Sequence, residues 1–117
     1  MEVTGMDVTK NNVLRIAPED RKWERTGFEG VQICVMRTND DRGASVLLKA
    51  ASGAGFPAHS HPGGGELLVI SGRVIVGGQV LSEGDYLWTP PGGVHDLECE
   101  EDALLFVNAP QGTKIVD

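Results

Sequence analysis

Apolar and polar residues alternate along most of the chain from Val31 onward. In the segment Val31–Met36, residues 31, 33 and 35 fall on one face and residues 32, 34 and 36 on the other, which is the period of a β-strand. No stretch of twelve residues repeats its apolar positions at the helical period of about 3.6 residues. The pattern therefore predicts a protein built from short strands.

Glycine, proline and acidic residues separate the predicted strands. The expected strands are Val31–Met36, Ala44–Ala51, Leu67–Ile70, Val74–Val76, Val80–Leu81, Tyr86–Thr89, His95–Cys99 and Ala103–Asn108, with weaker ones near 13–16 and 115–116. Turns are expected at 38–43, at Ser71-Gly72 and at Gly77-Gly78, whereas Pro90-Pro91 ends the strand before it. The acidic run within 98–102 is expected to form an exposed hairpin tip.

Short strands at regular spacing, with sixteen glycines to supply the turns, are typical of an antiparallel sandwich or barrel. A chain of 117 residues is expected to be a single domain, 1–117. Residues 1–12 are polar and lack periodicity, so they are expected to form a loose tail or an arm laid on a partner. Residues 18–30 are charged and irregular, with Trp23 and Phe28 as their apolar anchors.

The charge balance excludes some classes of partner. The net charge is −7 and the pI is about 4.8, which disfavours binding to nucleic acid or to an anionic membrane. No apolar run is long enough to span a membrane and no secretory signal begins the chain. Cys34 and Cys99 form no metal-binding or disulfide pattern, so we expect two buried thiols and a cytoplasmic protein.

The three histidines are the candidate chemistry. All of them lie in two glycine- and proline-rich stretches, Gly53–Glu66 and Gly84–His95. His59 and His61 are two residues apart, so on a strand both imidazoles project from the same face. His95 follows a Pro-Pro-Gly-Gly turn and begins the next strand. If the strands share a barrel, the three rings can hold a divalent metal and leave positions open for water or a substrate.

The two stretches resemble the two motifs of the cupin family. Gly53 is followed after five residues by His59-Ser60-His61, and Gly84 after five residues by Pro90-Pro91-Gly92 and then His95. The resemblance covers residues 53–99 and implies a double-stranded β-helix, or jelly-roll, barrel with a metal centre, often dimeric. The family's glutamate ligand corresponds either to Glu66 or to Gly65, because the spacing to Gly72 is one residue short. Cys99 replaces the family's asparagine.

The wider pattern is similar to a subgroup that includes the cupin domain of ChrR anti-sigma factors and dioxygenases acting on acetylacetone. This resemblance implies a metal-dependent dioxygenase for a small diketone or hydroxyketone, with Fe as the expected metal and Zn, Ni or Mn as alternatives. Two other functions stay open: a non-catalytic metal-containing sensor or ligand-binding cupin, and a sugar isomerase or epimerase. Tyr86 and Trp88 share one face, which lines either the pocket or a contact between subunits of a homodimer.

Overall fold

The computed structural model describes residues 7–8 and 13–116. Its elements are β1 (Asp7–Val8), β2 (Leu14–Arg15), the short 3-10 helix η1 (Pro18–Asp20), β3 (Glu24–Arg25), β4 (Val31–Thr38), β5 (Ala44–Ala50), β6 (Gly55–Ser60), β7 (Gly65–Val76), β8 (Gln79–Ser82), β9 (Tyr86–Thr89), β10 (Val94–Ala109) and β11 (Lys114–Ile115). The described residues include no α-helix, and none of their helices has the length and apolar character of a membrane span. The prediction of an all-β fold is confirmed.

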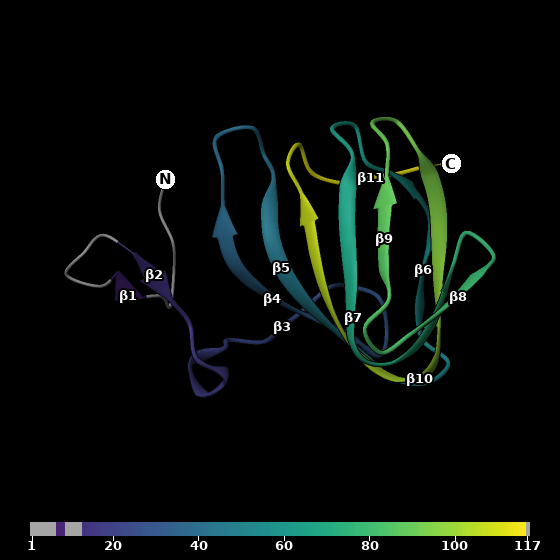
Figure 1. The fold of residues 1–117 in the computed structure, drawn as a ribbon, viewed down its shortest axis with the longest axis horizontal. Coiled ribbons are helices and arrows are strands. Elements are labelled where there is room, and N and C mark those ends of the chain that lie inside the picture. Colours follow the sequence, from purple (N-terminus) through teal and green to yellow (C-terminus); the bar gives the residue numbers. More distant parts are fainter. Residues whose placement is uncertain (1–6, 9–12, 117) are drawn as a thin grey trace.

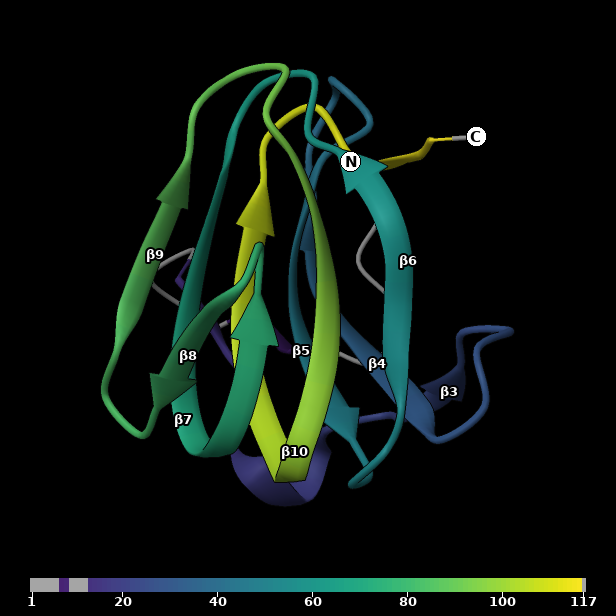
Figure 2. The ribbon, with the colours of Figure 1, turned by 90° about the vertical axis from the view of Figure 1, so that its right-hand side faces the viewer.

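The strands β3 to β11 curl into one barrel (Figures 1 and 2). The barrel has two walls, and the two long strands β7 and β10, which pair antiparallel with each other, contribute residues to both. The ends of these strands near Glu66 and Asn108 join β9, β5 and β4 in one wall, whereas their other halves join β8, β6 and β11 in the second wall. All these pairs are antiparallel, and the result is a jelly-roll barrel.

The core fills the barrel with alternate residues of each strand, as the period of two predicts. On β7, Leu67, Val69, Val74 and Val76 are buried, and on β10 the buried Leu105 faces the same interior. The buried core is Val31, Val46, Leu48, Ala50, Leu67, Val69, Val74, Val76, Leu81, Leu97, Cys99, Ala103 and Leu105. Both cysteines are free and buried, as expected from the sequence.

Two predicted boundaries are wrong, and both errors have the same cause. Ser71-Gly72 is not a turn between strands but a bend within β7, and the acidic run 98–102 is not a hairpin tip but the middle of β10. The pairing of β7 with β10 shifts register between Cys99 and Leu105, where both strands cross from one wall to the other. A bend that exposes polar side chains has the composition of a turn.

The segment near 13–16, expected as a strand at the edge of the sheet, instead pairs with Asp7–Val8. Strands β1 and β2 form a separate two-stranded sheet that lies apart from the barrel (Figure 1). The expected tail or arm at 1–12 otherwise lies outside the described residues. Strand β9 and the Gly77-Gly78 hairpin between β7 and β8 match the sequence prediction.

Candidate metal centre

Strands β6 and β10 bring the three histidines together at one end of the barrel. His59 on β6 lies directly opposite His95 on β10 in the antiparallel register, and a bulge follows between His95 and Leu97. Pro57 falls at this irregularity, where a residue without a backbone donor is tolerated. His61 follows the end of β6, and its backbone carbonyl accepts a hydrogen bond from Gly92 N–H at 2.9 Å. The Pro-Pro-Gly-Gly turn thus fixes His61 as well as His95.

The geometry of the three rings fits a shared ion. One ligand nitrogen of each histidine lies within 4.8 Å of the other two, and the Nε2 atoms of His61 and His95 are 3.3 Å apart. Two nitrogens bound to one ion at about 2.1 Å, with an angle of about 90–110° between them, lie roughly 2.9–3.4 Å apart. The rings are mutually edge-on, with centroids separated by 4.7 to 5.2 Å.

Each histidine ring has a hydrogen-bond partner at its Nδ1 atom. His59 Nδ1 lies 2.9 Å from the carbonyl oxygen of Pro57, and the hydroxyls of Thr113 and Thr89 lie 3.2 and 3.4 Å from Nδ1 of His61 and His95. A hydrogen bond at Nδ1 fixes the tautomer and the ring orientation of a metal-binding histidine. This pattern leaves Nε2 of each ring as the atom available to a ligand.

The electrostatics keep two of the rings neutral. Burial, followed by the neighbouring His59 and His61, lowers the pKa of His95 to about 4. Burial and then His59 also lower the pKa of His61. A neutral imidazole is the form that binds a metal ion, so His61 and His95 are in the binding form at neutral pH.

The structure separates Glu66 from the histidines. Gly65 is buried and faces them, since a Cβ atom on it would lie 3.3 Å from Cγ of His61. Glu66 is exposed on the opposite face, and its Oε2 accepts a hydrogen bond from the Tyr86 hydroxyl at 3.0 Å. The sequence left two positions open for the family's glutamate, and the one that faces the histidines is Gly65. The group of side chains that could hold a metal ion consists of the three histidines and does not include Glu66.

The histidines line a cavity of about 500 Å³ inside the barrel. Its walls are largely apolar, formed by residues such as Phe56, Leu87 and Val107. Thr89 and Thr113, which the sequence analysis missed as histidine partners, also line it, as does Arg42. The position of Thr89 within the second motif is the one sequence feature that could have identified it as a histidine partner. Thr113 lies outside both motifs and has no such feature. The cavity can enclose a small, mostly apolar ligand beside the three Nε2 atoms.

Tyr86, Trp88 and Cys99 lie outside the lining of the histidine cavity. Tyr86 and Trp88 are 56% and 60% exposed and face outward from β9, so neither lines the histidine cavity. The side chain of Cys99 lies in the core, where its thiol donates to the carbonyl of Glu101 at 2.8 Å. Burial, followed by the nearby Asp102, raises the pKa of this thiol, so Cys99 stays protonated and packs as a small apolar residue.

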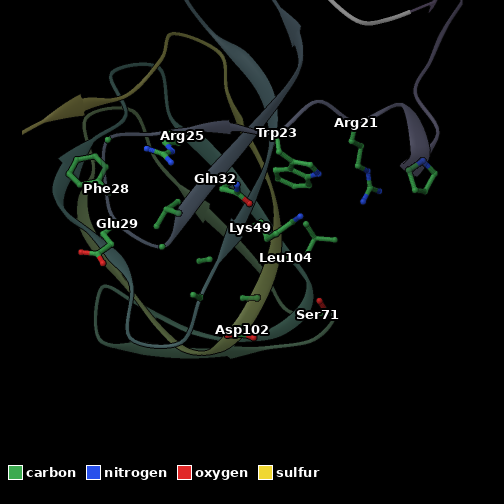
Figure 3. Close-up of a pocket in the computed structure, with 17 residues that line it drawn as sticks. Arg21, Trp23, Arg25, Phe28, Glu29, Gln32, Lys49, Ser71, Asp102 and Leu104 are labelled. Atoms are coloured by element: carbon green, nitrogen blue, oxygen red, sulfur yellow. The ribbon is translucent and has the colours of Figure 1, made fainter.

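A second, larger hollow of about 940 Å³ lies on the outside of the barrel and contains no histidine. Figure 3 shows the Trp23 ring above Lys49 there, with Arg21 and Arg25 on either side. The ammonium of Lys49 lies 4.2 Å from the centroid of that ring, a cation–π contact that pins segment 18–30 to β5. The predicted anchoring role of Trp23 matches this contact, whereas the candidate chemistry belongs to the smaller, inner cavity.

A jelly-roll barrel with one histidine on a strand, a second just beyond the end of that strand and a third on the neighbouring strand defines a cupin. The profile of the ChrR cupin-like domain family matches residues 11–112, and the chain belongs to that family. The resemblance drawn from the two motifs is thereby confirmed.

Similar proteins include both enzymes and a regulator. A candidate acetylacetone dioxygenase from Methylibium petroleiphilum superposes with a TM-score of 0.80 at 16% identity, covering 88% of this chain and 80% of that one. The anti-sigma factor ChrR, solved with SigE from Rhodobacter sphaeroides, gives 0.69 at 23% identity, covering 80% and 51%. At these identities the likeness establishes the fold alone.

One curated relative matches in sequence. The DNA damage-repair/toleration protein DRT102 of Arabidopsis thaliana is 36% identical over 69 residues, which cover 54% of this chain. This chain spans 22% of the length of that relative, so the match does not transfer the activity of the larger protein.

Proposed function

We propose that His59, His61 and His95 bind one divalent metal ion through their Nε2 atoms. The observation that carries the proposal is that each ring is fixed at Nδ1 by a separate partner while the three rings converge. Imidazole nitrogens suit Fe, Zn, Cu and Ni. Three protein ligands leave positions for other molecules, as in catalytic rather than purely structural sites.

We further propose that the site acts as a dioxygenase on a small 1,3-dicarbonyl compound, with Fe(II) as the metal. A ferrous ion in this position would supply oxygen activation and would favour the enolate form of the substrate. The reaction consumes one O₂ and cleaves one C–C bond of the diketone, giving a carboxylic acid and an α-ketoaldehyde that together contain both oxygen atoms. The largely apolar walls would favour the carbon skeleton of such a substrate, and Thr89 and Thr113 would keep the rings oriented.

Metal analysis of histidine variants tests the first part. We expect about one metal ion per chain in the wild-type protein, and H59A, H61A and H95A should each lose roughly 100-fold or more in affinity, beyond the 10–100-fold cost of losing a group that only orients a ligand. The matched control is E66Q, because Glu66 faces away from the cluster. Equal metal loss in E66Q, or unchanged metal in any histidine variant, would contradict the assignment.

Oxygen uptake by anaerobically Fe(II)-loaded protein tests the activity. A panel of 1,3-diketones and hydroxyketones should include at least one compound that consumes one O₂ per molecule cleaved. If the protein holds the metal but consumes no oxygen with any of them, the dioxygenase proposal fails and the metal assignment stands.

A non-catalytic sensor or ligand-binding role is the second candidate. It is favoured by membership of the family named after ChrR, whose solved structure is that of an anti-sigma factor bound to its sigma factor. A tightly held Zn ion without an exchangeable water would support this role. A sugar isomerase is less well supported, because among the described residues Arg42 is the one lysine or arginine that lines the cavity, and phosphosugar recognition usually needs several.

A further inference from the structure

Arg42 is the cationic residue at the wall of the histidine cavity. It belongs to the turn between β4 and β5, which lies at the same end of the barrel as the loop from β6 to β7 and the loop from β9 to β10 (Figures 1 and 2). Within the described part of the chain, no carboxylate lies within ion-pair distance of its guanidinium. Arg42 is exposed, and it therefore brings a positive charge without an ion-pair partner to the wall of a largely apolar cavity in a chain whose net charge is −7.

The backbone at Arg42 is strained in a way that the surrounding turn enforces. Its φ is +67°, and it is the one described residue other than glycine with a positive φ. The Asn39 side chain holds the turn, since its Oδ1 accepts hydrogen bonds from the N–H groups of Asp41 and Gly43 at 3.0 and 2.8 Å. A left-handed backbone at a residue other than glycine is uncommon, and such residues cluster at functional sites as well as in turns.

The same turn is docked on the segment that holds His61. Asn39 Nδ2 donates to the carbonyl of Pro110 at 2.9 Å, and Gly43 approaches Pro110 so closely that a Cβ atom would overlap its carbonyl oxygen. Thr113, three residues further on, contacts Nδ1 of His61. The backbone of the turn that carries Arg42 and the segment that contacts His61 are therefore joined by one continuous set of contacts.

We propose that Arg42 binds the carboxylate of an anionic substrate whose other end enters the histidine cluster. The inference rests on the proposed function and specifies its substrate class: a 1,3-dicarbonyl compound that also carries a carboxylate, such as a 2,4-dioxo acid. The apolar walls offer no other cation to such a group, and a guanidinium pairs with a carboxylate through two parallel hydrogen bonds. Glu66, which also borders the cavity, directs its carboxylate to the Tyr86 hydroxyl and does not compete.

Two ligands that differ in one group provide the test. Acetopyruvate and acetylacetone share the same 1,3-dicarbonyl unit, and acetopyruvate has a carboxylate where acetylacetone has a methyl group. Their dissociation constants are measured by calorimetry on protein loaded with Zn(II), which prevents turnover, for wild type, R42Q and R42K. The control variant is R37Q, which removes an exposed arginine of β4 that does not line the cavity.

We expect R42Q to weaken acetopyruvate binding by about 10-fold or more, the range for a charged hydrogen bond, and to leave acetylacetone binding within about 2-fold. R42K should retain part of the preference, and R37Q all of it. Equal weakening by R42Q and R37Q, or none by R42Q, overturns the role of Arg42. Zinc content and acetylacetone binding are measured in the same samples. A wild-type protein that binds no zinc would contradict the proposed metal site, which distinguishes that failure from a failure of the role of Arg42.

Discussion

His95 is the residue whose titration the fold changes most clearly. Its pKa is lowered to about 4 by burial and by His59 and His61, whereas an unfolded histidine titrates near 6.5. Between these values the unfolded chain binds a proton that the folded, metal-free chain excludes, so stability falls as the pH drops from about 6.5 to about 4. We expect the melting temperature of EDTA-treated wild-type protein to fall by several degrees more over this range than that of H95Q.

Carboxylates also begin to titrate near the lower limit, so the comparison with H95Q is essential. The two proteins should differ in the slope of melting temperature against pH, because only the wild type carries the depressed histidine at position 95. Parallel curves would mean that His95 titrates normally in the metal-free protein.

Single residues also mark the limit of what the sequence could predict about the site. The spacing of His59 and His61 and the turn before His95 sufficed to predict that the three rings meet. Their Nδ1 partners could not be predicted, because a backbone carbonyl at Pro57 has no sequence signature and Thr113 is distant in the chain. The choice between Gly65 and Glu66 depended on where β7 begins, and a shift of one residue reverses the face.

At the scale of elements, the bends of β7 and β10 determine whether the barrel can close. Gly72 has a φ of +88°, and a Cβ atom there would overlap the carbonyl oxygen of Asp102. Gly84 has the same φ with no atom within 4 Å of its Cβ position. We therefore expect G84A to lose about 1–2 kcal/mol from backbone strain, and G72A about 3 kcal/mol or more because a clash adds to the strain.

Urea unfolding of both variants measures the difference, since their backbone strain is matched. Equal losses would mean that the two long strands can move apart at Gly72 without cost. The same bend explains the boundary errors of the sequence analysis: a glycine within a strand and a polar run at a crossing carry the signals of a turn. Strands without such bends, β4, β5 and β9, were predicted to within two residues.

For the whole molecule, we expect a second copy of the chain to bind the outer face of the wall formed by β7 and β9. Leu68, Ile70, Tyr86 and Trp88 are 39%, 39%, 56% and 60% exposed, and Leu68 pairs with Tyr86 across the two strands. Two chains of net charge −7 repel each other over most of their surfaces, so an association needs a face with little charge. Glu66 on this face is bonded to Tyr86.

The two-stranded sheet formed by β1 and β2 is a second surface that a dimer could cover. It pairs with no strand of the barrel, and an isolated two-stranded sheet is only marginally stable in water. A twofold dimer can bury identical apolar patches against each other and let each two-stranded sheet pack on the other subunit. The predicted homodimer would then use this face, which is consistent with one of the two roles that the sequence left open for Tyr86 and Trp88.

Light scattering after size exclusion tests the dimer. The wild-type protein should have twice the mass of the 12.5 kDa chain, and L68E should have the mass of one chain, because a buried, unpaired carboxylate strongly disfavours the interface. V80E is the matched control, since Val80 is 56% exposed on β8 in the other wall, and it should remain a dimer. A monomeric wild-type protein, or a dimeric L68E, would exclude this face as the interface while leaving the histidine site inside each barrel unaffected.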